Sequence, residues 1–216
     1  MKVAVIGATG FTGHHITKEL ADRNINVLGI SRKGAIADTP FINYISMDVI
    51  NVSGLAEIIK DCDAVVNAFN PGWNTPEIYD LFIKGAQAIQ AAVKLSGVKR
   101  LIVIGGAGSL YVSPGGPQVI DTIPNDHPFY AGAKAAKDYL EIIKQETELD
   151  WAFFSPALEM HQGITTGRTG QYRLGTDYPV TDENGKNVLS GEDLAVVIAD
   201  EIEHPKHHRV RFTAAY

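Results

Sequence analysis

Tyr130 and Lys134 stand four residues apart in a segment of helical character, and this spacing places both side chains on one face of a helix. A lysine ammonium group beside a phenol favours the phenolate and lowers the pKa of the tyrosine from about 10. Tyr130 would then be a usable proton donor in general acid catalysis. The same spacing also arises in helices that place the tyrosine in the core and the lysine on the surface, so both interpretations stay open.

Three glycines near the amino terminus, Gly7, Gly10 and Gly13, follow a short β-branched run and precede a helical pattern that extends to about Arg23. A strand, a glycine turn and a helix are the context in which such glycines bind a dinucleotide. Gly7 permits the tight turn, Gly10 lets the backbone approach a pyrophosphate, and Gly13 lets the helix pack closely on the strand. The free N–H groups and the dipole of the helix would favour phosphate there, whereas the alternative is a turn without a ligand.

The end of the second predicted strand, residues 26–30, bears on the choice between NAD and NADP. An Asp or Glu at this place usually accepts hydrogen bonds from the ribose 2′-OH of NAD, whereas an Arg suits the 2′-phosphate of NADP. Ser31, Arg32 and Lys33 follow the strand, and the next acid is Asp38. These residues favour NADP over NAD, with a solvated basic turn as the alternative.

Strands alternate with helices along the chain, which predicts right-handed crossovers and an α/β parallel sheet whose ligands bind beyond the carboxyl ends of the strands. A single domain, residues 1–216, is expected, in which the glycine-rich segment 158–189 forms a substrate-side loop or lid. The predicted strands are 3–6, 26–30, one within 41–49, 63–69, 100–104, 151–154 and 210–215, with weaker strand signals near Tyr172 and Val180. The predicted helices are 11–23, 53–60, a helix capped by Thr75 that ends at Ser96, 129–148, and a helix with a capping box at 190–193 that ends near Glu203.

Composition excludes several classes of function. The formal charge of 19 − 25 = −6 argues against a nucleic-acid partner, which would need a basic face. No apolar run approaches the roughly 18 residues of a membrane span. Met1 leads directly into the first strand and Cys62 is the one cysteine, so we expect a cytoplasmic protein without a disulfide.

Histidines cluster after the last predicted helix, at His204, His207 and His208. Pro205 interrupts their spacing, so a solvated turn is expected there and no metal site is predicted.

Four segments, GATGFTG (7–13), VIGGAGSL (103–110), WAFFSPA (151–157) and GRTGQYRLG (167–175), resemble the atypical short-chain dehydrogenases/reductases. The resemblance extends nearly from end to end and is closest to the NADH-flavin reductase-like and NmrA-like subgroup, near biliverdin reductase B. It implies a Rossmann-type doubly wound parallel sheet. The coenzyme-binding residues it implies are Gly7, Thr9, Gly10, Phe11, Thr12 and Gly13 for the pyrophosphate, Ser31 and Arg32 for the 2′-phosphate, Asp48 and Val49 beside the adenine, Ala68, Phe69 and Asn70 beside the ribose, Gly105 and Gly106 after the fifth strand, and Pro156 and Ala157 beside the nicotinamide. By itself, an Asp at position 48 is equally expected as a helix-side cap.

The resemblance also assigns candidate catalytic residues. Short-chain reductases pair the Tyr and Lys with a Ser or Thr after the fifth strand, and the Lys can also hold the nicotinamide ribose. Ala107 aligns with that Ser or Thr and Ser109 lies two residues later, so the set Tyr130, Lys134 and Ser109 is incomplete or displaced. Several members of the subgroup lack a working set, which fits direct hydride transfer to a bound flavin, because the coenzyme carries the chemistry.

These observations predict a reductase that binds NADP, with NAD possible, and passes hydride to a small-molecule acceptor of flavin or quinone type. A non-catalytic, NADP-sensing regulator of NmrA-like type is the alternative. A sugar-nucleotide epimerase or dehydratase would need a larger substrate domain and the full catalytic set. The protein is expected to be a monomer or a homodimer.

Overall fold

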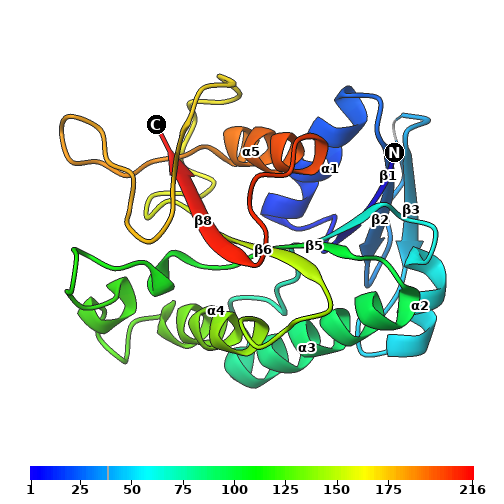
Figure 1. The fold of residues 1–216 in the computed structure, drawn as a ribbon, viewed down its shortest axis with the longest axis horizontal. Helices are drawn as coiled ribbons and strands as arrows, with labels where there is room; N and C mark the ends of the chain where they lie inside the picture. The colour runs from blue at the N-terminus through cyan, green and yellow to red at the C-terminus, as the bar shows by residue number, and fades with distance from the viewer. Residues whose placement is uncertain (38) are drawn as a thin grey trace.

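The structure, a computed structural model that describes residues 1–37 and 39–216, is an eight-stranded sheet with helices on both faces (Figure 1). The strand order is β3-β2-β1-β4-β5-β6-β8-β7. Neighbouring strands are parallel except at one edge, where β7 pairs with β8 in the antiparallel sense. The predicted Rossmann-type α/β fold is therefore confirmed. The strands are β1 (Lys2–Ile6), β2 (Asn26–Ser31), β3 (Ile42–Ser46), β4 (Ala64–Asn67), β5 (Arg100–Ile104), β6 (Asp150–Ser155), β7 (Arg173–Gly175) and β8 (Val210–Ala215).

Two groups of helices enclose this sheet. Helices α1 and α5 lie together on one face, and α2, α3 and α4 lie on the other (Figure 1). The helices are α1 (Phe11–Asp22), α2 (Val52–Ile59), α3 (Ile78–Ser96), α4 (Tyr130–Ile143) and α5 (Gly191–Glu203), with short 3-10 turns η1 (Ala107–Ser109) and η2 (Val119–Thr122) between β5 and α4.

Alternate residues of each central strand pack into two separate cores. In β1, Val3 and Val5 belong to the core beneath α1 and α5, whereas Ala4 and Ile6 belong to the core beneath the other three helices. A parallel sheet covered on both faces buries both sides of its strands. This burial explains the continuous apolar runs that predicted the strands.

The start of α3 differs from the prediction. The helix begins at Ile78 after Glu77, no side chain caps it, and the expected N-cap at Thr75 is wrong. The Thr75 carbonyl instead accepts the Ile78 N–H at 3.2 Å and closes a turn before the helix. The helix ends as predicted, at Gly97, whose φ of +85° suits glycine.

The end of α4 also differs, because the helix stops at Ile143 rather than near Glu148. A carboxylate in the connection holds the chain in a turn instead, since Glu146 accepts the backbone N–H of Glu148 at 2.7 Å. The backbone carbonyl of Glu146 accepts the indole N–H of Trp151 at 3.2 Å. These contacts direct the chain into β6.

Segment 158–189 contains β7, near the predicted signal at Tyr172, but the described residues form no strand at Val180. The buried carboxylate of Asp193, in the first turn of α5, fixes part of this segment. It accepts the backbone N–H groups of Thr169 and Gly170 at 2.9 and 2.8 Å and the hydroxyl of Tyr216 at 2.7 Å. Ser190 caps α5 through the N–H of Asp193, so only half of the expected capping box forms.

Candidate dinucleotide site

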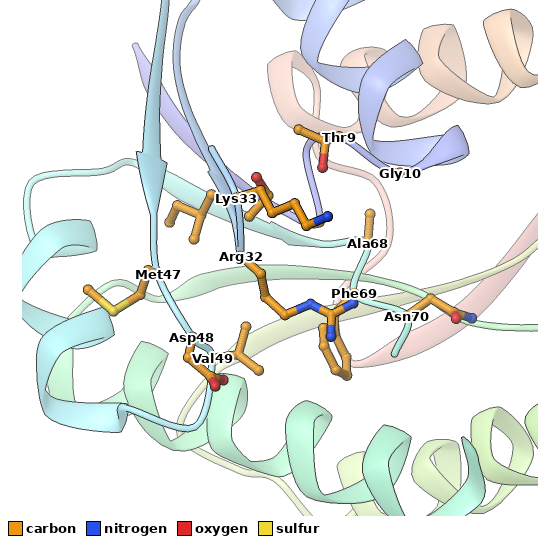
Figure 2. A pocket seen from close by; sticks show the side chains of 13 residues that line it. Thr9, Gly10, Arg32, Lys33, Met47, Asp48, Val49, Ala68, Phe69 and Asn70 are labelled. Carbon is orange, nitrogen blue, oxygen red and sulfur yellow. The ribbon is translucent and has the colours of Figure 1, made fainter. Parts of the chain in front are cut away.

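A pocket of about 260 Å³ lies at the carboxyl ends of β1, β2 and β4, beside the loop that follows β3 (Figure 2). All of its lining residues except Ile30 and Met47 were expected at the coenzyme site from the sequence. The lining residues are Gly7, Thr9, Gly10, Ile30, Ser31, Arg32, Lys33, Met47, Asp48, Val49, Ala68, Phe69 and Asn70.

The glycine turn after β1 depends on the absence of side chains at two positions. Gly7 has φ of +83°, and a Cβ there would lie 2.4 Å from the carbonyl oxygen of Ala68. A Cβ at Gly13 would lie 2.1 Å from the carbonyl oxygen of Gly7. Both distances are far shorter than van der Waals contact. The tight turn and the close packing of α1 on the strand are therefore present as the sequence predicted.

The amino terminus of α1 faces the same turn. Gly10 precedes the helix, no side chain caps it, and its first turn carries no acidic residue. A Cβ at Gly10 would lie 3.3 Å from the Gly7 carbonyl oxygen, so a side chain would crowd the turn. The first N–H groups of a helix have no partner within the helix, and together with the dipole they can bind an anion.

Two cations and a hydroxyl lie at the end of β2. Arg32 and Lys33 both extend across the pocket, Arg32 towards Phe69 and Lys33 towards Thr9 (Figure 2). The Ser31 hydroxyl is buried and has no hydrogen-bond partner among the described residues. A buried hydroxyl without a partner is costly unless a ligand completes it. This end of the pocket can therefore accept a phosphate. Asp38, the next acidic residue in the sequence, lies outside the described residues.

The opposite wall follows β3. Met47 and Val49 contribute apolar surface, and the backbone N–H of Met47 donates to the Ser31 carbonyl at 3.0 Å. Asp48 lines the pocket and also accepts the N–H of Ile50 at 3.1 Å. Asp48 therefore both lines the pocket and accepts a hydrogen bond as a local cap.

A buried amide that the sequence analysis did not select shapes the end of β4. The Asn67 side chain is 3% exposed and accepts the N–H of Phe69 at 3.0 Å. The Phe69 ring packs on α3, where a Cβ at Gly85 would lie 2.3 Å from it. Asn70 accepts the N–H of Gly72 at 2.8 Å. These contacts hold the backbone of residues 68–70 at the pocket edge.

The remaining predicted coenzyme residues lie outside the lining of this pocket. The Phe11 ring meets His15 edge to face at 5.2 Å and approaches Gly191, so it packs towards α5. Gly105 lies against the Phe153 ring, which a Cβ would meet at 2.0 Å. The other members of this set are Thr12 and Gly13 in the first turn of α1, Gly106 after β5, and the buried Pro156 and Ala157 after β6.

Lys134 makes its contacts on α4 and α3. Its ammonium group pairs with the carboxylate of Asp138, which also accepts the Tyr79 hydroxyl at 2.8 Å. The ammonium lies 5.0 Å from the centroid of the Tyr79 ring. The hydrogen bond to Asp138 raises the pKa of Lys134. Tyr130 is the first residue of α4, and no side-chain hydrogen bond joins its hydroxyl to Lys134 within residues 1–37 and 39–216.

Ser109 is buried in η1, 1% exposed. Its hydroxyl lies 3.2 Å from the hydroxyl of Ser155 and 3.4 Å from the Gly106 carbonyl oxygen. Arg211 and Gln118 donate to the Ser109 carbonyl oxygen. The structure thus does not bring Tyr130, Lys134 and Ser109 into one hydrogen-bonded set, and their catalytic roles stay predictions.

In the part of the chain that the structure describes, no group of three or more His, Cys, Asp and Glu side chains is arranged to hold a metal ion. His207 is not part of a solvated turn, because its ring stacks on Phe212 at 4.1 Å and its Nδ1 lies 2.7 Å from Glu201 Oε2. No described helix is both long and apolar enough to cross a membrane.

A parallel sheet with a glycine turn, a helix terminus and a basic strand end around one pocket defines a Rossmann-type dinucleotide-binding protein. Residues 7–205 match the family described as NAD(P)H-binding. The chain therefore belongs to this family of atypical short-chain dehydrogenases/reductases.

Three relatives span almost the whole chain. The Bacillus subtilis strain 168 protein YwnB is 33% identical over 99% of this chain and 97% of its own. A "putative epimerase" from Bacteroides thetaiotaomicron is 39% identical, with a TM-score of 0.88 over 100% of this chain and 96% of that one. A "putative NADH-flavin reductase" from Streptococcus pneumoniae TIGR4 is 30% identical, with a TM-score of 0.86 over 100% and 99%.

Proposed function

We propose that this protein is an NADPH-preferring reductase that passes hydride to a flavin or quinone-like acceptor. The observation that carries the proposal is the pocket that joins the glycine turn to Arg32, Lys33 and the unpartnered Ser31 hydroxyl. Membership of the NAD(P)H-binding family supports the coenzyme. The similarity to the Streptococcus pneumoniae protein supports a flavin acceptor.

The residues present fit NADP(H) because each part of the coenzyme has a matching surface. The turn at Gly7 and the terminus of α1 hold the pyrophosphate through backbone N–H groups. Arg32 and Ser31 hold the 2′-phosphate, since a guanidinium group binds phosphate through parallel hydrogen bonds. Lys33, which lies beside Arg32 in the lining, adds a second positive charge.

The rest of the lining orients the coenzyme. Val49 and Met47 would contact the adenine, and the backbone of residues 68–70 would contact the adjoining ribose. Pro156 and Ala157, which are buried after β6, would give the nicotinamide an apolar contact surface and would exclude water from it.

When bound, the coenzyme supplies a hydride, two electrons with one hydrogen nucleus, to the acceptor, and one proton completes the reduction. Tyr130 is the first residue of α4 and is partly exposed, and we assign its hydroxyl to deliver that proton. Lys134 must leave Asp138 before it can reach a ribose hydroxyl.

A second candidate is a regulator that binds NADP without turnover. Two observations favour it: Lys134 is paired with Asp138, and the Ser109 hydroxyl is buried against Ser155. A protein that only senses the coenzyme needs the pocket but no proton donor.

NADPH absorbance, followed with riboflavin, FMN and simple quinones, tests the proposal. We expect acceptor-dependent oxidation by the wild type and a slower rate for Tyr130→Phe. Calorimetry with NADPH and NADH is the parallel measurement. Coenzyme binding without oxidation of any acceptor would establish the regulator, and no binding by folded protein would overturn both candidates.

A further inference from the structure

Two large aromatic side chains stand exposed beyond the carboxyl ends of the neighbouring strands β4 and β5. Trp73 lies in the loop between β4 and α3 and is 51% exposed, and Phe129 immediately precedes α4 and is 56% exposed. Their rings meet edge to face, with centroids 5.4 Å apart and planes at 82°. We call Trp73 and Phe129 the aromatic pair.

The aromatic pair is held in place rather than loosely solvated. Trp73 lies on the first turn of α4, where a Cβ at Gly132 would meet its ring at 2.6 Å. The His127 ring lies 5.5 Å from that of Phe129, and the His127 Nδ1 accepts the Phe129 N–H at 3.3 Å. The glycine at position 132 and this local turn fix both rings before any ligand arrives.

One member of the aromatic pair is close in sequence to the proposed coenzyme pocket, and the other is close in sequence to the proposed proton donor. Trp73 follows Asn70, at the pocket edge, by three residues, and Phe129 is adjacent to Tyr130. Since β4, β5 and β6 are neighbours in the sheet, the loops that follow them share one edge. The hydride acceptor has to lie at this edge.

The chemistry of the pair selects a flat, conjugated ligand. Because the two rings are half-exposed and already in place, a planar π system that covers them would bury apolar surface and make favourable aromatic contacts. Exposed apolar patches also mark binding sites. Within residues 1–37 and 39–216, the Trp73 indole N–H has no hydrogen-bond acceptor, in contrast to that of Trp151. A carbonyl group on the ligand can accept that N–H.

We propose that Trp73 and Phe129 form the acceptor subsite, which takes a planar ring system that bears carbonyl groups, as in an isoalloxazine or a naphthoquinone. This inference rests on the proposed function and names the ring-binding surface of its acceptor. It requires no step of chemistry by the pair, which binds and orients.

Tryptophan fluorescence offers a direct readout of binding, because the chain has two tryptophans and Trp151 is 2% exposed. Protein saturated with NADP⁺, which has no hydride to give, is titrated with riboflavin and, in a separate arm, with 2-methyl-1,4-naphthoquinone. We expect saturable quenching in at least one arm, and the two arms distinguish the two ring systems. The dissociation constant should rise about tenfold in Phe129→Leu, which loses the aromatic ring but keeps an apolar side chain.

Trp73→Leu is measured through the ligand's own absorbance and should show a similar loss. Leu95→Ala, an exposed apolar position at the far end of α3, is the matched control and should bind as the wild type does. Unchanged acceptor affinity in folded Trp73→Leu and Phe129→Leu, or no quenching in either arm, would overturn the subsite. NADP⁺ affinity, measured by calorimetry in the same variants, should stay unchanged, so a failure of the coenzyme site is recognised separately.

Discussion

The ammonium group of Lys134 pairs with the carboxylate of Asp138, one helical turn further along α4, and not with the phenol of Tyr130. Burial alone would raise the pKa of Asp138, but hydrogen bonds from Lys134 and Tyr79 outweigh it and lower that pKa. The carboxylate therefore stays ionised and keeps hold of the lysine. This pairing sets the first prediction.

Asp138→Asn should release Lys134 towards the coenzyme ribose. We expect NADPH to bind several-fold more tightly, because the lysine no longer has to leave a carboxylate, and the free energy of unfolding to fall by less than about 1 kcal/mol. Calorimetry and thermal unfolding measure the two effects. Glu141→Gln, which removes the exposed pair with Lys144 on the same helix, is the control. Weaker coenzyme binding in Asp138→Asn would show instead that Asp138 positions Lys134 for the ribose.

Arg32→Ala should remove the preference for NADP. The lost charge-assisted hydrogen bonds correspond to about a 10- to 100-fold rise in the NADPH dissociation constant, whereas NADH affinity should hardly change. Lys99→Ala is the control, because it removes one positive charge at the amino end of β5, at the opposite edge of the sheet. Equal affinities of wild type and Arg32→Ala for both coenzymes would remove the assignment.

Gly13→Ala should destabilise the fold by about 3 kcal/mol, because its Cβ would lie 2.1 Å from the Gly7 carbonyl oxygen and α1 would have to move away. Urea unfolding gives the value. Gly97→Ala serves as the comparison, since that position has a positive φ but nothing within 4 Å, and about 1 kcal/mol is expected there. Similar losses in both variants would contradict the packing argument.

The buried carboxylate of Glu146 should make stability depend on acidity. Burial alone would raise its pKa, but the Glu148 N–H, Gln90 and Lys94 outweigh it and lower the pKa to about 2. Because the folded value lies below the unfolded one, the stabilisation is present above about pH 5 and is lost as the pH falls towards 2.

Glu146→Gln tests directly whether the ionised Glu146 carboxylate stabilises the fold. The variant should lose about 2 kcal/mol at pH 7 and show a flatter fall in stability between pH 5 and pH 2. The Glu148 carboxylate is 65% exposed, so Glu148→Gln should retain the wild-type acid profile. A Glu146→Gln curve parallel to that of the wild type would contradict the assignment.

The pocket could be predicted because its chemistry is local in sequence. Each lining residue lies at the carboxyl end of a strand or within four residues after it, and parallel strands bring these ends to one edge, so Arg32 and Asp48 could be placed together without a structure. Met47 had the same signal, because it adjoins Asp48, which was selected. Asn67 adjoins the selected Ala68 in the same way, but the sequence does not show the turn that its side chain holds.

The side-chain contacts of the candidate catalytic residues were harder to predict than the pocket. Tyr79 reaches Asp138 across the packing of α3 on α4, and no sequence pattern records a contact between residues that are 59 positions apart. The Lys134–Asp138 spacing was visible as an i, i+4 pair, and it competes with the Tyr130–Lys134 pair of the same spacing. Sequence alone does not say which partner the lysine chooses.

The hydrogen bonds that Asp193 accepts from the backbone of Thr169 and Gly170 limit how the protein can respond to a ligand. Arg168, between Gly167 and Thr169, is itself fastened to Glu19 of α1 by two hydrogen bonds of 2.8 and 2.9 Å. Residues 168–170 are thereby fixed to the two helices on one side of the sheet. A rearrangement that encloses the reactants has to hinge in the stretches on either side of this anchored tripeptide, or else displace α1 and α5 together.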